Sequence, residues 1–175
     1  ARMVRNHGEM IIPSAEKRSY KTEFLGWGYR MTELEAGLGI AQLSKLEKLN
    51  NERIKLAKIL SLEINRIDGL KHTKYDHVKH VYYVFAFSYD ENKIGISRDN
   101  FCKALLAEGI PCGGGYVKPL YMNPIYLEKS AFAFKHYKGN AKYKKGICPV
   151  TESLNENEVI ILPECRPPAT KEDML

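Results

Sequence analysis

The stretch LGWGYRMTELEAGLGIAQL, residues 25–43, joins a glycine-rich turn to the start of a long helix. Thr32 and Glu35 have the spacing of a capping box, in which a hydroxyl and a carboxylate satisfy the free amides of a helix start. Apolar residues then recur at helical spacing as far as Ile64, and Asp68-Gly69 is a typical stop signal. The sequence therefore predicts one helical region between Thr32 and Asp68.

The residues before this turn show no sustained helical or strand period. Gly8, Pro13 and the polar run from Ser14 to Tyr20 indicate an irregular arm. We expect residues 1–30 to form this arm and a loop, residues 31–69 to form a linking helix, and residues 70–175 to form a separate domain.

Strand and helix signals alternate after residue 70. HVYYVFAFSYD (80–90) is aromatic and β-branched enough for a buried strand that ends in a turn, and EVIILP (158–163) predicts another short strand. Ser97 is positioned to cap a short helix that Gly109 closes. The expected fold class is α/β, a small sheet with helices on one face, preceded by the arm and the long helix.

Two further segments allow more specific expectations. The run Gly113 to Gly115 interrupts a predicted strand, which fits either a backbone that a ligand or partner approaches closely or a flexible turn. Residues 123–147 read as a loop region with helical pieces. TKEDML (170–175) resembles the capped start of a helix.

Composition limits the class of protein. The chain has 175 residues, 44% of them hydrophobic, without an apolar run near the roughly 20 residues of a membrane span. The first residues lack a signal-peptide pattern, so we expect a soluble, cytoplasmic protein. The four cysteines lie far apart without metal-ligand spacing, which favours buried free thiols over two disulfides and argues against a metal site.

The formal net charge of +6 suits nucleic acid, an acidic membrane surface or a phosphorylated small molecule. Lysines between 135 and 145 alternate with Phe134, Tyr137 and Tyr143. Such a run is usually a solvated face that aromatic residues anchor. The alternative is nucleic-acid binding, but no recognisable nucleic-acid motif accompanies the run, so it remains a minor hypothesis.

Four segments together resemble, in order, landmarks of the DegT/DnrJ/EryC1/StrS family of sugar aminotransferases. They are VRNHGE (4–9), LGWGYRMTELEAGLGIAQLSKLE (25–47), KPLYMNPIY (118–126) and CPVTESLNENEVIILP (148–163). The resemblance implies the aspartate-aminotransferase fold, fold type I. It also implies pyridoxal 5′-phosphate (PLP) as cofactor for moving an amino group, commonly from glutamate or glutamine, onto a nucleotide-linked keto sugar.

In that family the domain with the Schiff-base lysine precedes the RNHG segment. The resemblance therefore implies that this chain corresponds to the C-terminal portion, carries no catalytic residue of its own and does not transaminate alone. A separate chain could supply the lysine domain. The sequence leaves open which sugar nucleotide and which amino donor are used.

The resemblance also implies cofactor-binding positions. The segment matching residues 26–30 reaches across a homodimer interface in the family, where an asparagine at the position of Gly28 commonly helps hold the cofactor phosphate. Glycine removes that side chain, although its own amide could serve. Arg30 is the better anion contact because its planar fork suits phosphate; alternatively, it pairs with Glu33 or with a carbonyl.

The implied substrate-binding residues are His7, Tyr116, Lys118 and Tyr121. The family often shows His-Tyr and Pro-Leu-His where this chain has Gly115-Tyr116 and Pro119-Leu120-Tyr121. The identity of the substrate therefore does not carry over. Hydroxyls and a lysine still suit a diphosphate or a sugar ring, or these residues serve ordinary structural roles.

Two function classes follow from the sequence. The first is the C-terminal portion of a nucleotide-sugar aminotransferase from cell-surface polysaccharide or secondary-metabolite biosynthesis. The second is a non-catalytic dimerisation or sugar-nucleotide-binding module derived from it. Both predict association through residues 1–60, because the arm and helix are expected to expose apolar surface.

Overall fold

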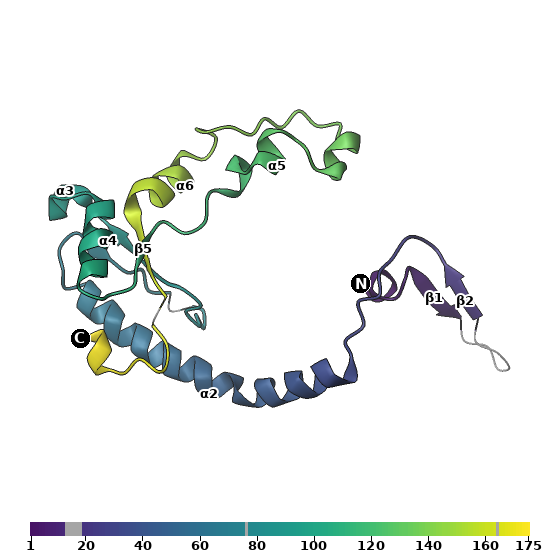
Figure 1. The fold of residues 1–175 in the computed structure, drawn as a ribbon, viewed down its shortest axis with the longest axis horizontal. Helices are drawn as coiled ribbons and strands as arrows, with labels where there is room; N and C mark the ends of the chain where they lie inside the picture. The colour runs from purple at the N-terminus through teal and green to yellow at the C-terminus, as the bar shows by residue number, and fades with distance from the viewer. Residues whose placement is uncertain (13–18, 76, 164) are drawn as a thin grey trace. The chain divides into compact units, whose positions relative to one another are not determined.

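The computed structural model describes residues 1–12, 19–75, 77–163 and 165–175 (Figure 1). It divides into two compact units, Ala1–Glu47 and Lys48–Leu175, which we call unit 1 and unit 2. Pro13 and the polar run as far as residue 18 lie outside the described residues, so the expectation for that stretch stays a prediction.

Unit 1 is more regular than its sequence predicts. It begins with a short helix, α1 (Arg2–Arg5), followed by strands β1 (Glu9–Ile12) and β2 (Ser19–Thr22). The strands pair in antiparallel register, Glu9 opposite Thr22. Four-residue strands are too short for a period to be visible in the sequence, and it is their mutual pairing that makes them strands.

Helix α2 (Glu33–Ile64) begins where the capping box predicts. The amide and hydroxyl of Thr32 donate to Glu35 Oε2 at 2.8 and 3.0 Å, and the Glu35 amide donates back to Thr32 Oγ1 at 3.3 Å. The helix ends before Asp68-Gly69. Directly after it, the Asn65 side chain pairs with the backbone of His72.

Unit 2 contains a four-stranded sheet in the order β3-β4-β6-β5, with each neighbouring pair antiparallel. Its strands are β3 (Leu70–Lys71), β4 (Phe85–Tyr89), β5 (Gly113–Gly114) and β6 (Val159–Leu162). The predicted strand 80–90 is regular only from Phe85, after Tyr82 adopts a positive φ of 50°. The predicted glycine-interrupted strand keeps two residues.

The helices of unit 2 start at polar caps. Helix α3 (Glu91–Ile94) replaces the expected turn, with Asp90 accepting from the Asn92 amide, and helix α4 (Arg98–Ala107) starts after Ser97, as predicted. Residues 116–147, green in Figure 1, leave the sheet after β5 and return through α6. The remaining elements are η1 (Leu120–Met122), α5 (Pro124–Leu127), η2 (Phe132–His136), α6 (Pro149–Ser153), η3 (Leu154–Glu158) and η4 (Glu172–Met174).

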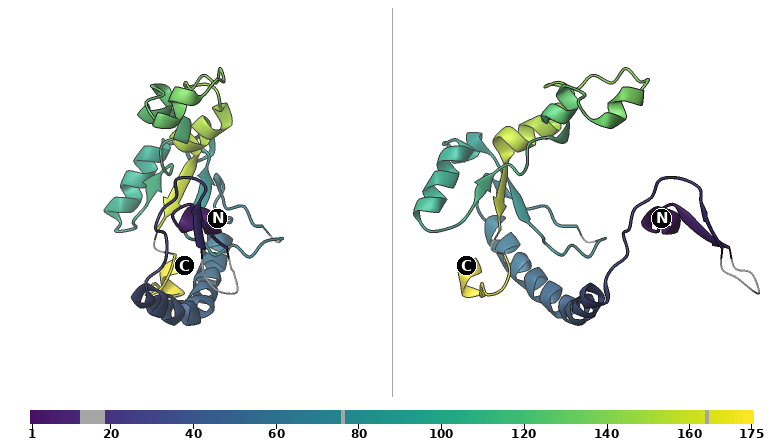
Figure 2. Two further views of the ribbon diagram at one scale, coloured as in Figure 1. Left: turned by 90° about the vertical axis from the view of Figure 1, so that its right-hand side faces the viewer. Right: turned by 45° about the vertical axis from the view of Figure 1, so that its right-hand side comes forward.

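One face of the sheet carries the core of unit 2. Phe85 and Phe87 of β4 and Ile160 of β6 lie on this face and pack with Ala57 of α2 and Cys102 of α4. Both helices lie beside the sheet in Figures 1 and 2. The alternate residues of the strands point to the opposite face, which is open. The prediction of helices on one face is confirmed.

The four cysteines are free thiols, as predicted. Cys102 and Cys165 are buried, and burial raises the pKa of each to about 11, whereas Cys112 and Cys148 are half-buried. Within the described ranges, no group of His, Cys, Asp and Glu has an arrangement that could hold a metal ion. No helix in the described part of the chain is both long and apolar enough to cross a membrane.

Candidate functional site

Two of the landmark segments lie against each other in unit 1. The amide of His7 donates to the carbonyl of Trp27 at 3.1 Å, and the amide of Tyr29 donates to the carbonyl of Arg5 at 3.0 Å. Gly28 occupies the antiparallel bridge between these bonds. The RNHG segment (5–8) and the Gly-Trp-Gly-Tyr-Arg turn (26–30), which are separate in the sequence, therefore form one structure through these bonds.

Glycines make this pairing sterically possible. Gly8 has a φ of +72°, and a Cβ there would lie 1.7 Å from the carbonyl oxygen of Phe24. A Cβ at Gly26 would lie 2.0 Å from the Gly8 nitrogen. Because backbone meets backbone at both positions, no side chain fits between the two segments.

Three of the predicted site residues lie on this pairing. A Cβ at Gly28 would be 3.2 Å from His7 Cε1, so the imidazole occupies the space beside the glycine. Among the described residues, the Gly28 amide makes no hydrogen bond and Arg30 makes neither a hydrogen bond nor an ion pair, Glu33 included. The turn thus presents an amide, an imidazole and a guanidinium to solvent, a donor set that suits an oxyanion.

Trp27 and Tyr29 alternate with these residues along the turn. Their rings stack on each other, with centroids 6.0 Å apart and planes 13° from parallel, and both remain exposed. The two side chains therefore pack on each other in unit 1.

The remaining predicted residues lie in unit 2, after β5. Tyr116 is exposed, and the charge and hydrogen bond of neighbouring Tyr83 raise the pKa of its hydroxyl. Lys118 is exposed and makes no hydrogen bond or ion pair with the described residues. Tyr121 donates to Oε1 of buried Glu152 at 2.5 Å. These three residues therefore differ in how freely they can meet a ligand.

Glu152 binds both ends of the segment 122–145, which leaves the sheet of unit 2 and which we call the excursion. Its Oε1 also accepts from the Gly146 amide at 2.7 Å, so both ends of the excursion are bound to one carboxylate oxygen. The hydroxyl of Tyr121 and then this amide lower the pKa of Glu152, while burial and the contact with Glu152 raise the pKa of Tyr121. The Tyr121 hydroxyl is thus engaged in holding the chain together.

The glycine run is approached closely by the chain itself. A Cβ at Gly114 would lie 2.6 Å from Arg98 Nε, and one at Gly115, whose φ is +69°, would lie 2.5 Å from the Asn155 carbonyl oxygen. Arg98 is buried and donates to that same carbonyl at 2.6 Å. The group that approaches Gly114 closely is the Arg98 guanidinium of this same chain, whereas approach by a ligand or partner stays a prediction.

The lysine-rich excursion fits the solvated-face interpretation. Residues 123–147 contain six lysines and one glutamate. The rings of Tyr126, Phe134 and Tyr143 contact one another at centroid distances of 5.5–6.3 Å, so the aromatic residues anchor the segment internally. Lys145 pairs with Glu156 at 2.7 Å.

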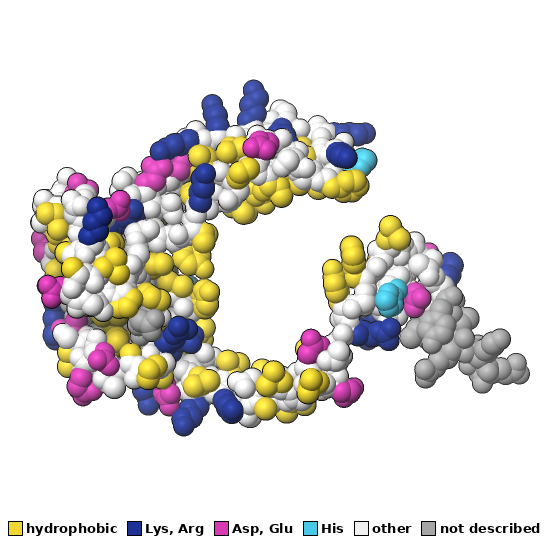
Figure 3. All heavy atoms as spheres, in the orientation of Figure 1, with side chains coloured by type: hydrophobic (Ala, Val, Ile, Leu, Met, Phe, Trp, Pro, Cys, Tyr) yellow, Lys and Arg dark blue, Asp and Glu magenta, His cyan; other side chains and the backbone are white. Residues whose placement is uncertain are grey.

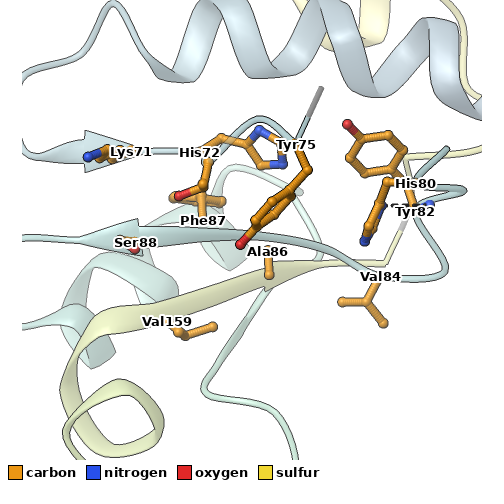
Figure 4. A pocket seen from close by; sticks show the side chains of 11 residues that line it. Lys71, His72, Tyr75, His80, Tyr82, Val84, Ala86, Phe87, Ser88 and Val159 are labelled. Carbon is orange, nitrogen blue, oxygen red and sulfur yellow. Dashed lines mark hydrogen bonds between the residues drawn. The ribbon is translucent and has the colours of Figure 1, made fainter. Parts of the chain in front are cut away.

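The open face of the sheet holds a hollow that the sequence did not predict (Figure 4). Its volume is about 280 Å³, and His72, Tyr75 and His80 stand around a floor that includes Ala86 and Val159. These residues come from separate parts of the sequence, and only the repeated aromatic and histidine residues of 72–83 could have signalled them. An adjoining hollow of about 550 Å³ includes Tyr116.

Comparison with known families settles the membership of the chain. The DegT/DnrJ/EryC1/StrS aminotransferase family matches residues 1–174. The chain belongs to this family. An uncharacterized protein of Methanocaldococcus jannaschii, MJ1066, is 31% identical over 135 residues, which cover 77% of this chain and 32% of that protein.

A second relative is the Bacillus subtilis spore coat polysaccharide biosynthesis protein SpsC. It is 24% identical over 143 residues, covering 80% of this chain and 37% of SpsC. The chain thus spans about a third of the length of each of these two relatives.

Solved structures agree with the fold. A DegT/DnrJ/EryC1/StrS aminotransferase from Brucella abortus matches 99% of this chain with a TM-score of 0.67 at 25% identity, and this chain covers 39% of it. The PLP-form of the putative sugar aminotransferase Spr1654 from Streptococcus pneumoniae matches 99% with the same TM-score at 18% identity, again over 39% of that chain. The predicted fold class is confirmed.

Proposed function

We propose that the chain is the C-terminal portion of a cytoplasmic, PLP-dependent nucleotide-sugar aminotransferase. In this proposal residues 1–30 are the arm and trans loop, residues 31–69 the linking helix, and residues 70–175 the small domain. The observation that carries the proposal is the pairing in unit 1, in which the Gly28 amide, the Arg30 guanidinium and the His7 imidazole have no hydrogen-bond partner among the described residues.

The donors of unit 1 fit the phosphate of PLP. The Gly28 amide and the Arg30 guanidinium would hold the phosphate, and the His7 imidazole would bind substrate beside them. When bound, PLP supplies an electron sink for amino-group transfer. No residue of this chain is assigned the Schiff-base role, and the proposed portion is inactive without a second polypeptide part that supplies it.

The substrates proposed are a nucleotide-linked keto sugar and glutamate or glutamine. Tyr116 and Lys118 are exposed after β5 and offer a hydroxyl and an ammonium to a diphosphate. The name of SpsC supports polysaccharide biosynthesis as the setting.

Association into a homodimer is part of the proposal. Leu34 is 85% exposed, and Leu38, Ile40, Leu43 and Leu46 of α2 are exposed as well. Figure 3 shows hydrophobic side chains along this part of the helix. A helix that is apolar on several sides needs cover. Light scattering at micromolar concentration should find a dimer or larger species, and a compact monomer would contradict this part.

The test of the proposal is a PLP titration of the purified chain, followed by absorbance, borohydride trapping and peptide mass mapping. The expected result is no stoichiometric lysine adduct, whereas Gly28 and Arg30 show amide NMR shifts that Arg30→Gln removes. Arg66→Gln is a matched control, because Arg66 is exposed and, among the described residues, its side chain is bonded to Glu63. A saturable adduct on one lysine would overturn the proposal.

The second candidate function is a non-catalytic dimerisation or sugar-nucleotide-binding module. One observation favours it: Gly28 offers no side chain, and His7 fills the adjoining space. It predicts that the chain binds a nucleotide sugar while neither Gly28 nor Arg30 responds to PLP in the same titration.

A further inference from the structure

Two cysteine thiols meet where α4 contacts β5. Cys102 lies in α4, and Cys112 is the residue directly before β5. The Cys112 thiol donates to the Cys102 carbonyl at 3.5 Å, and the two thiols also form a hydrogen bond with each other. The two sulfur atoms are therefore neighbours in space, although nine residues separate them in the sequence.

The two thiols differ in their access to solvent. Cys102 is 6% exposed and belongs to the apolar core of unit 2, whereas Cys112 is half-buried. Burial, and then the charge and hydrogen bond of Cys112, raise the pKa of Cys102 to about 11. Because reactivity follows exposure and thiolate content, an oxidant in the solvent meets Cys112 first, and Cys102 is the second thiol behind it.

Both cysteines belong to elements that are held against the same strand, β6. Strand β5 pairs with β6 directly, with Gly113 opposite Ile161. In α4 the buried Arg98 side chain donates to the Val159 carbonyl of β6 at 3.5 Å and to the nearby Asn155 carbonyl at 2.6 Å. A disulfide forms without backbone movement only where the two residues are already close, and this anchoring keeps them close.

The other two thiols have different neighbours. Cys148 forms a hydrogen bond with the Tyr121 hydroxyl, and Cys165 lies near the Arg53 guanidinium. Within the part of the chain that the structure describes, neither of them is hydrogen bonded to another cysteine. The geometry therefore singles out Cys102 and Cys112 as a pair.

We propose that Cys102 and Cys112 form a modification site at which hydrogen peroxide converts the two thiols into an intramolecular disulfide. The Cys112 thiolate attacks one peroxide oxygen and the O–O bond breaks, so Cys112 becomes a sulfenic acid and the released hydroxide takes up the thiol proton as water. The Cys102 sulfur then attacks the Cys112 sulfur, and the S–OH bond breaks as the S–S bond forms. The displaced hydroxide and the Cys102 proton leave as a second water, so two thiols have lost two electrons to one peroxide.

The disulfide would constrain the glycine run. Cys112 directly precedes Gly113–Gly115, and Tyr116 and Lys118 follow the run. A covalent bond to α4 removes backbone conformations that three glycines otherwise permit. Oxidation thus changes the segment that carries the exposed Tyr116 and Lys118, and thiol reductants reverse the change. This inference goes beyond the proposed function and does not depend on it.

The test treats the full chain with hydrogen peroxide, blocks the remaining thiols with N-ethylmaleimide and maps tryptic peptides without reduction. Trypsin cuts after Arg98, Lys103 and Lys129 but not between Lys118 and Pro119, so the two cysteines fall in peptides 99–103 and 104–129. The expected product is these two peptides joined, from a chain that migrates as a monomer under denaturing, non-reducing conditions. Dithiothreitol should separate them.

Three variants assign the steps. Cys112→Ser should abolish the linked peptides and leave Cys102 reduced. Cys102→Ala removes the second thiol, so Cys112 should stop at the sulfenic acid, which dimedone labels. Cys148→Ser is the matched control, because Cys148 is half-buried like Cys112, and it should form the linked peptides as the parent chain does. Circular dichroism of each variant checks that the fold is retained.

Several results would overturn the proposal. One is the absence of linked peptides at a peroxide concentration that already oxidises Cys148. Another is Cys102 or Cys112 joined mainly to Cys148 or Cys165, or a link found only in cross-linked dimers. Amide NMR signals of Gly113 and Gly114 should shift on oxidation and return with dithiothreitol, and unchanged signals in the oxidised chain would refute the effect on the glycine run.

Discussion

Units 1 and 2 are stabilised in different ways. In unit 1 the segments around Gly8 and Gly28 are joined through backbone hydrogen bonds, and Gly8 alone among its described residues is buried. Unit 2 has a core of apolar side chains around Phe85 and Ile160, both fully buried. Its buried polar residues are bonded to neighbouring elements, as with Arg98 and Asn155.

This difference explains where polar groups remain available to bind a ligand. In unit 1 neither the Arg30 side chain nor the Gly28 amide has a hydrogen-bond partner among the described residues, because the paired segments are held by backbone contacts at glycines rather than by side-chain packing. In unit 2 the polar groups of Glu152 and Tyr121 are already used to hold loops. The candidate donors of unit 1 are therefore available to a ligand, whereas in unit 2 the Tyr121 hydroxyl is engaged and Lys118 is exposed.

The largest effect expected comes from the core of unit 2. Phe85→Ala should lower the free energy of unfolding by about 3–5 kcal/mol, because a fully buried ring leaves a cavity. Leu34→Ala, at an 85% exposed position, should change it by less than about 0.5 kcal/mol in the monomer. Denaturant unfolding followed by circular dichroism measures both free energies. Equal decreases in the two variants would contradict the proposed difference between the units.

The next effect tests the glycine geometry of unit 1. Gly8→Ala should separate the two paired segments at a cost of about 1–3 kcal/mol, because the methyl group meets the Phe24 carbonyl and φ is positive. Gly37→Ala is the control: its Cβ meets nothing within 4 Å, and alanine should favour the helix. Amide NMR signals of Trp27 and Gly28 report the pairing, and unchanged signals in Gly8→Ala would refute this account.

A smaller effect concerns the carboxylate of Glu152. The hydrogen bonds of Tyr121 and Gly146 lower its pKa, so its stabilisation is present above the unfolded pKa of about 4.3 and is lost as the pH falls through the lowered value. Tyr121→Phe should therefore destabilise unit 2 at pH 7 more than in acid. Unfolding midpoints at neutral and acid pH measure this, with exposed Tyr137→Phe as the control, and a pH-independent loss would contradict it.

The smallest effect concerns His72. Burial and then nearby His80 lower its pKa, so its contribution is complete above the unfolded value of about 6.5 and declines as the pH falls below it. Unfolding midpoints should decrease on acidification less steeply in His72→Gln than in the parent chain. His136→Gln, at an exposed position, should leave the slope unchanged. A parallel slope in both variants would show that His72 does not titrate in this way.

Local signals account for the correctly predicted elements. The capping box at Thr32 and Glu35 and the cap at Ser97 involve residues three apart, so they can be recognised within one turn of helix. The ends of strands depend on partners elsewhere, which is why the segment 80–90 forms a strand only where β6 or β3 pairs with it.

In the candidate site, too, the sequence indicated local features but not the contacts between distant segments. The sequence singled out Gly28, Arg30 and His7 by resemblance, but not the backbone pairing that joins them. It also left two explanations for the glycine run, since the guanidinium that approaches Gly114 belongs to Arg98 on another element. For the hollow on the open face, the repeated aromatic and histidine residues of 72–83 are the one local signal, because its floor comes from β4 and β6.

The sequence by itself determined the family, the long capped helix and the residue types available for binding anions, because these depend on neighbouring residues or on ordered motifs. Only the tertiary structure decided which polar groups form hydrogen bonds within the fold and which remain exposed. The Tyr121 hydroxyl is bound to Glu152, whereas Arg30 has no partner among the described residues. That distinction depends on contacts between distant segments, and contact in space is set by packing.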